Sequence, residues 1–164
     1  MKMKKVLAVM LCLISSMAMS AQSVETVGTV ELGSAYEEAL KAIKAEFGEP
    51  VSTSESEVVY ANKKFRGFSF DEVKFRFKNG QFNEARFYSK VGSRGEAQRK
   101  MENIAQTMRT KYELSRDVEE DMTWFYKGGR SPLGIGHLFT IYTYRRQGAY
   151  GVELRFGPIN FPQQ

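Results

Sequence analysis

The sequence contains few of the residues on which most catalytic and metal sites depend. Its 164 residues include one Cys, one His, one Trp and four Pro. A disulfide framework or a zinc site built from Cys pairs is therefore excluded. The length fits one domain of about 100–200 residues, and a large multidomain enzyme is excluded.

The first 21 residues have the pattern of a secretory signal peptide. Three of the first five residues are Lys, an apolar run occupies residues 6–14, and small side chains precede a cleavage position near Ser20 or Ala21. The apolar run is too short to span about 30 Å of hydrocarbon as an anchor. We therefore expect a periplasmic or secreted protein.

Removing this segment changes the composition. A cut after Ala21 leaves 143 of the 164 residues and removes three Lys and no acid, so the net charge falls from +5 to +2. Cys12 is lost as well, which leaves no thiol nucleophile and no disulfide. No later run approaches the 18 consecutive apolar residues of a membrane span. A charge of +2 and an exported product argue against nucleic acid as a partner.

The first part of the remaining chain predicts a flexible lead, a helix and three strands. Residues 22–32 are polar and weakly patterned, which indicates a lead that is mobile or pairs with a strand edge. Ser34 and Glu37 then have the spacing of a capping box before an apolar stripe at helical spacing, which ends at Phe47. A short β stretch at 58–61 precedes a hairpin around Asn79-Gly80, and a phase slip in its return strand predicts a β-bulge near Asn83-Glu84.

The pattern then starts again. Gly92-Ser93 opens a second capping box and a longer helix, and a β run follows at 122–126. A Gly-rich connection leads to a second hairpin around Gln147-Gly148. In this hairpin the sequence predicts that Phe139, Ile141 and Thr143 lie opposite Phe156, Leu154 and Val152.

These patterns predict an α+β fold. We expect two tandem helix–β3 units, residues 33–91 and 92–157, which form an antiparallel sheet with both helices on one face and the other face solvated. Each half would be marginal alone, so a single domain at 33–164 with one shared core is expected after the lead at 22–32.

A resemblance supports this expectation. The helix segment that ends in Phe47-Gly48-Glu49-Pro50, the Phe75–Gly80 hairpin and the second copy from Ser93 to Phe156 resemble the beta-lactamase-inhibitor-protein-like fold. They are also similar to the small envelope modules of the SmpA/OmlA and PepSY-like kinds. The resemblance implies binding, inhibition or envelope assembly rather than catalysis, and it carries over no functional residues.

Candidate catalytic features are isolated. His137 has no acidic residue close in sequence, and zinc would need further ligands from Asp or Glu alone. The Gly128–Gly136 segment lacks the ending of a P-loop and precedes a strand, so a flexible connection or a binding loop is expected. The adjacent acids, such as Asp71-Glu72, would point to opposite faces of a strand. We expect no metal and no cofactor.

The solvated face of the predicted sheet is the better candidate for a site. Aromatic and Arg side chains on an open sheet are typical of protein interfaces, although Tyr and Arg also occur on solvated strands that bind nothing. The second hairpin also presents Thr140 and Glu153 there, and the first presents Lys78 and Arg86. The candidate binding residues are Tyr142, Tyr144, Arg155, Lys74 and Arg76.

The sequence therefore predicts a non-enzymatic binding module that acts in protein–protein interaction or inhibition, with an envelope or secreted protein as partner. The alternative is a small secreted hydrolase or carbohydrate-binding protein that uses Asp and Glu with or without His137. A third possibility is pairing through an exposed strand edge. The sequence does not indicate an oligomeric state.

Overall fold

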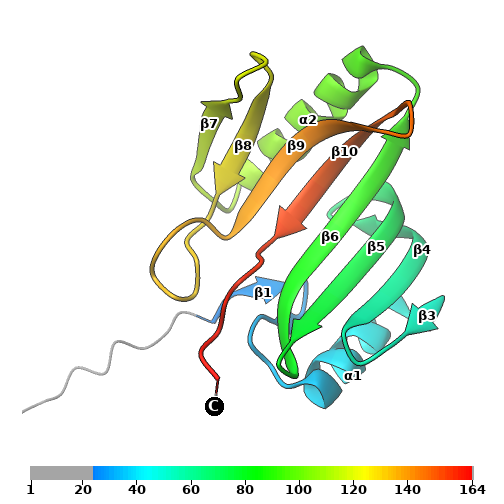
Figure 1. The fold of residues 1–164 in the computed structure, drawn as a ribbon, viewed down its shortest axis with the longest axis vertical. Coiled ribbons are helices and arrows are strands. Elements are labelled where there is room, and N and C mark those ends of the chain that lie inside the picture. The colour runs from blue at the N-terminus through cyan, green and yellow to red at the C-terminus, as the bar shows by residue number, and fades with distance from the viewer. Residues whose placement is uncertain (1–23, 164) are drawn as a thin grey trace, which may run out of the picture.

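A computed structural model describes residues 24–163, and β-strands hold more than twice as many of them as helices do (Figure 1). Eight strands form one antiparallel sheet in the order β3-β4-β5-β6-β10-β9-β8-β7, and β1 and β2 form a separate two-stranded sheet. The helices are α1 (Tyr36–Phe47) and α2 (Arg94–Arg109). The strands are β1 (Thr26–Val27), β2 (Val30–Glu31), β3 (Ser52–Thr53), β4 (Glu57–Phe65), β5 (Phe68–Lys78), β6 (Gln81–Val91), β7 (Leu114–Val118), β8 (Trp124–Gly128), β9 (Phe139–Arg146) and β10 (Ala149–Phe156).

The predicted architecture of two tandem helix–β3 units, with both helices on one face of the sheet, is wrong. The chain is predominantly β, with an eight-stranded sheet, a second small sheet and only two short helices among residues 24–163. Strands β1, β2 and β3 are not predicted, because two residues cannot show a periodicity. Strand β7 is not predicted either, because this edge strand buries little and has no apolar alternation.

The described part of the predicted lead at 22–32, residues 24–32, forms a small hairpin that packs onto the core. Val27 and Val30, which are fully buried, pair across the β1–β2 hairpin, and Leu32 follows them into the core. The predicted signal peptide, residues 1–21, lies outside the described residues. No helix in the described range is long and apolar enough to cross a membrane.

Both predicted hairpin turns are confirmed. Asn79 and Gly80 join β5 to β6 with φ of 53° and 72°, and Gln147 and Gly148 join β9 to β10 with φ of 49° and 80°. Two consecutive positive φ angles match the right-handed twist of the flanking strands. The register of the second hairpin is also as predicted, with Phe139 opposite Phe156 and Ile141 opposite Leu154.

The predicted β-bulge is confirmed as well. Phe77 pairs with Phe82, but Arg76 pairs with Glu84, so Asn83 is the extra residue of β6. The bulge turns Phe82 and Ala85 into the core, where both are fully buried. It therefore leaves Glu84 and Arg86 on the opposite face of the sheet.

The core is rich in aromatic side chains. Phe87 of β6 lies at its centre, stacked on Phe65 with 4.2 Å between ring centroids. Phe47, at the end of α1, packs against Phe75 at 5.1 Å and Phe87 at 6.3 Å. Helix α2 contributes its buried stripe of Ala97, Met101, Ile104, Ala105 and Met108 to the same cluster. Because one contiguous core joins all these elements, the described region is stabilised as a unit.

Truncation of the central ring tests this arrangement. We expect Phe87→Ala to lower the free energy of unfolding by about 3–5 kcal/mol, because it leaves a cavity among the surrounding rings. The matched control is Phe125→Ala, since Phe125 is a half-buried Phe on β8. Urea unfolding followed by circular dichroism measures both, and equal losses in the two variants would contradict the assigned core.

Candidate functional site

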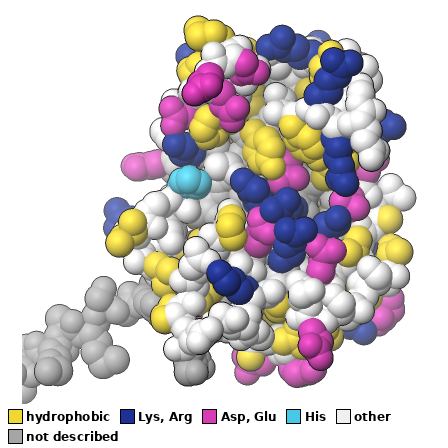
Figure 2. Space-filling view, in the orientation of Figure 1, with side chains coloured by type: hydrophobic (Ala, Val, Ile, Leu, Met, Phe, Trp, Pro, Cys, Tyr) yellow, Lys and Arg dark blue, Asp and Glu magenta, His cyan; other side chains and the backbone are white. Residues whose placement is uncertain are grey.

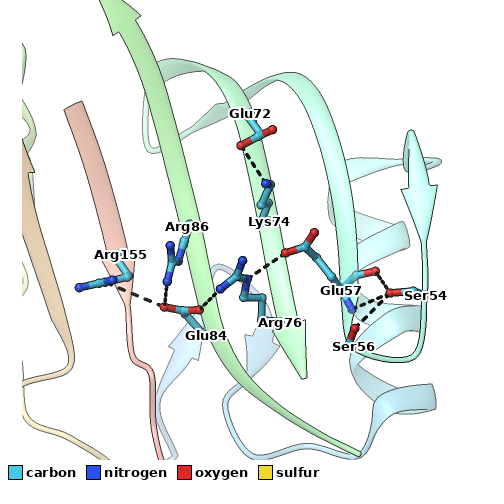
Figure 3. A network of polar contacts seen from close by, with 9 residues as sticks. All are labelled: Ser54, Ser56, Glu57, Glu72, Lys74, Arg76, Glu84, Arg86 and Arg155. Atoms are coloured by element: carbon cyan, nitrogen blue, oxygen red, sulfur yellow. Dashed lines mark hydrogen bonds and ion pairs between the residues drawn. The ribbon is translucent and has the colours of Figure 1, made fainter. Parts of the chain in front are cut away.

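The face of the sheet turned toward the viewer in Figure 2 carries polar and Tyr side chains from β4, β5, β6, β10 and β9, and we call it the outer face. Lys and Arg side chains gather over its middle, with acidic side chains among them. Three of its Arg come from different strands: Arg76 from β5, Arg86 from β6 and Arg155 from β10. The bulge at Asn83 places Glu84 between them (Figure 3).

Glu84 is the centre of this group. Its side chain is only 4% exposed, and its Oε1 lies 2.9 Å from Arg86 Nη2 and 4.0 Å from Arg155 Nε. Its other oxygen lies 3.5 Å from Arg76 Nη1. Arg76 Nε also donates a hydrogen bond of 2.8 Å to Glu57 Oε2, which extends the group onto β4. We call these residues the Glu84 network.

The Glu84 network keeps its charges in place because the carboxylates and guanidiniums are close and partly shielded from water. Burial alone would lower the pKa of Arg86, but the nearby Glu84 and Glu153 outweigh it and hold this pKa above its ordinary value. Glu153, which is 6% exposed, accepts a hydrogen bond from the Tyr142 hydroxyl. The acidic groups of the outer face therefore have partners within the fold.

The Tyr side chains form a second, adjoining part of the outer face. Tyr142 lies 5.7 Å from Tyr144, and Tyr144 lies 5.1 Å from Tyr88, between ring centroids. Gly151 makes room for this row, since a Cβ there would lie 2.5 Å from Tyr88 Cε2. The Arg155 guanidinium lies over the Tyr142 ring at 5.5 Å and joins the Tyr row to the Glu84 network. Burial and Glu153 raise the pKa of both Tyr142 and Tyr144, so their hydroxyls stay protonated.

The structure brings the five candidate residues to one face. Arg76 and Arg155 contact Glu84, and Tyr142 and Tyr144 lie beside Arg155. Lys74 is set apart from them by its ion pair with Glu72, at 3.3 Å. Sequence reasoning misses Glu84 and Tyr88. The predicted bulge is the signal for Glu84, because the extra residue decides which face its carboxylate takes.

His137 lies at the start of the second hairpin, between cations. Burial, Lys127 and Arg155 all lower its pKa. The Gly128–Gly136 loop beside it is closed by two backbone hydrogen bonds, from Ser131 N to Gly136 O at 3.2 Å and from Gly134 N to Ser131 O at 2.8 Å. Among residues 24–163 no group of three His, Cys, Asp or Glu side chains has the arrangement of a metal site.

This arrangement suits binding better than proton transfer. A general base needs a carboxylate or imidazole within reach of a substrate, and its action is helped by a partner of opposite charge. Glu84 and Glu153 are buried and already engaged, and His137 faces Lys127 and Arg155 rather than an acid. The outer face instead offers guanidinium groups and Tyr rings held in fixed positions.

Neutralising the central carboxylate tests the Glu84 network. We expect Glu84→Gln to lower the free energy of unfolding by about 2–4 kcal/mol, because three Arg then lack their shared buried partner. Glu72→Gln is the matched control on the same face. Its carboxylate is 38% exposed and pairs only with Lys74, so a loss of about 0–1 kcal/mol is expected. Indistinguishable urea midpoints for the two variants would contradict the assigned role of Glu84.

The environment of His137 gives a second test. We expect its imidazole to titrate below the ordinary value of about 6.5, and Lys127→Gln to raise this pKa by removing a nearby positive charge. Proton NMR follows the one imidazole of the chain directly. Lys90→Gln, on β6, should leave the pKa unchanged, and an equal rise in both variants would show a general charge effect instead.

Comparisons with known proteins do not identify a relative. No protein-family model matches the chain, and neither the curated proteins nor the solved structures give a match. The resemblance to beta-lactamase-inhibitor-protein-like, SmpA/OmlA and PepSY-like proteins therefore stays a prediction, and the function is argued from the outer face.

Proposed function

We propose that this protein is an exported, non-enzymatic binding module that recognises an acidic surface of another envelope or secreted protein through its outer face. The export part of the proposal rests on the signal-peptide pattern of residues 1–21. The recognition part rests on how the charges of the outer face are arranged by depth.

The observation that carries the proposal is the difference in exposure between the two acids at the middle of the outer face and the three Arg around them. The side chain of Glu84 is 4% exposed, whereas those of Arg76, Arg86 and Arg155 are 40%, 29% and 30% exposed. Glu153 is buried as well. At its middle the outer face thus hides two carboxylates and presents three guanidinium groups, so a partner that docks there meets positive charge. The exposed acids of this face, Glu57 at 28% and Glu72 at 38%, lie to one side of it on β4 and β5.

Tyr and Arg together are the residues that contribute most to protein interfaces. The Tyr rings supply contact area with few rotatable bonds, and the Arg side chains donate hydrogen bonds in a fixed planar arrangement. Here the rings are held by each other and by Glu153, and the Arg by Glu84. Less conformational entropy is therefore lost when a partner binds.

Site-specific crosslinking followed by affinity measurement tests the proposal. A photo-crosslinking amino acid at Tyr144 should capture an envelope partner in cells, whereas the same group at Val51, which is 71% exposed near β3, should not. With the captured protein purified, we expect Tyr142→Ala with Tyr144→Ala to weaken binding roughly tenfold or more, as loss of two central aromatic residues does.

Two controls make this experiment decisive. Thermal unfolding establishes that the double variant is folded, and Val51→Ala should bind as the unchanged protein does. Affinity should also fall as salt is added, because an acidic partner is attracted by the exposed Arg. Unchanged affinity in the folded double variant would overturn the assignment of the outer face.

A further inference from the structure

A cavity of about 390 Å³ lies beside the outer face, between the Gly128–Gly136 loop, the start of β9 and the segment that follows β10. Its polar lining includes Ser131, His137, Thr140 and Arg155, and no Asp or Glu lines it. This volume falls within the range of about 300–1,000 Å³ that is usual for small-molecule sites.

The fold builds this cavity rather than leaving it between mobile parts. Thr140 and Arg155 are direct partners in the β9–β10 register. The chain after β10 is fixed by the bulge, since Ile159 N donates a 2.9 Å hydrogen bond to Asn83 O. Gly157, with φ of 77°, allows this approach, because a Cβ there would lie 2.4 Å from Asn83 O.

The polar groups of the cavity have unused hydrogen-bonding capacity. Thr140 Oγ1 and Arg155 Nε are buried and have no hydrogen-bond partner among residues 24–163. The nearest acid to Arg155 Nε is Glu84 Oε1 at 4.0 Å, which is an ion pair but too long for a hydrogen bond. Buried polar atoms without partners are costly, so these donors favour a ligand or water that accepts from them.

The remaining lining is apolar. Leu133, Ile135, Pro158 and Ile159 surround the polar groups, and Ile135 is 88% exposed at the rim. A partly apolar ligand in the cavity would cover the exposed Ile135 side chain and remove apolar surface from water. Together, one guanidinium, two hydroxyls and an apolar wall match a single negative charge carried on a small apolar body.

We propose that this cavity binds a carboxylate group attached to a small apolar body, with Arg155 and Thr140 as donors. The guanidinium offers its planar pair of N–H groups to the two carboxylate oxygens. Ser131 is 4% exposed, and its Oγ accepts from Leu133 N at 3.3 Å, which leaves its hydroxyl proton available for another acceptor. Lys127, near His137, adds to the positive field that attracts the anion.

His137 reports occupancy, because it lines the cavity and is the only His of the chain. The charged groups that lower its pKa are Lys127 of β8 and Arg155 of β10. A bound carboxylate opposes both, so the proton NMR signals of the imidazole should shift and its pKa should rise. The measurement uses the full chain and no protein partner. Absence of carboxylate binding would therefore leave the protein-partner proposal intact, and absence of a protein partner would leave the carboxylate proposal intact.

Titration with butyrate at constant ionic strength tests the site. We expect a saturable shift of the His137 signals with a dissociation constant on the order of 1 mM, as befits a ligand of few atoms. Butyramide, which has the same shape without the charge, should give no shift. Thr140→Val and Arg155→Gln should each weaken butyrate binding about tenfold, since each removes a donor to a charged group.

Lys90→Gln is the matched control, because it removes a positive charge from the same sheet outside the cavity. It should bind butyrate as the unchanged protein does. A short peptide with an apolar C-terminal residue and a free carboxylate, compared with its amidated form, distinguishes a peptide terminus from a free acid as the source of the carboxylate. No saturable shift with butyrate, or equal binding in folded Thr140→Val, would overturn the proposal.

Discussion

The extra residue at Asn83 is the constraint on which the polar side of this molecule depends. Without it, β6 would keep one alternation from Phe82 onward, and Glu84 would share the core face with Phe82. The bulge instead turns Ala85 and Phe87 inward and Glu84 and Arg86 outward. Its carbonyl also accepts from Ile159 N and so holds the segment that closes the cavity beside Arg155. One inserted residue therefore positions both proposed binding regions.

The burial of Glu84 has a cost that its surroundings must offset. A nearly buried carboxylate is unfavourable unless charged donors surround it, and here three Arg do so from three strands. Such a network contributes less to stability than an apolar packing would, because each charge loses hydration. What it provides is position: each guanidinium is fixed relative to its neighbours. Such a network is useful in a binding surface, because the buried Glu84 holds the three exposed guanidinium groups in position for a partner.

The sequence predicts the features that local chemistry determines. Asn79-Gly80 and Gln147-Gly148 specify their turns, the phase slip specifies the bulge, and Ser93 caps α2 by accepting from Glu96 N at 3.2 Å. The matching motif at Ser34 fails, because α1 starts at Tyr36 and Ser34 Oγ donates to Glu31 O instead. That contact depends on the β1–β2 hairpin, which has too few residues to show a pattern. The overall architecture is mispredicted for the same reason, since short and edge strands are defined by their partners.

The candidate site shows the same division between local and long-range information. Alternation along β5, β9 and β10 suffices to place Arg76, Tyr142 and Arg155 on one face. It cannot show that Glu84 lies beneath them or that Arg155 also lines a cavity, because these contacts join residues far apart in the chain. Arg155 thereby connects the two regions: it lies over Tyr142, pairs with Glu84 and reaches the polar lining next to Thr140.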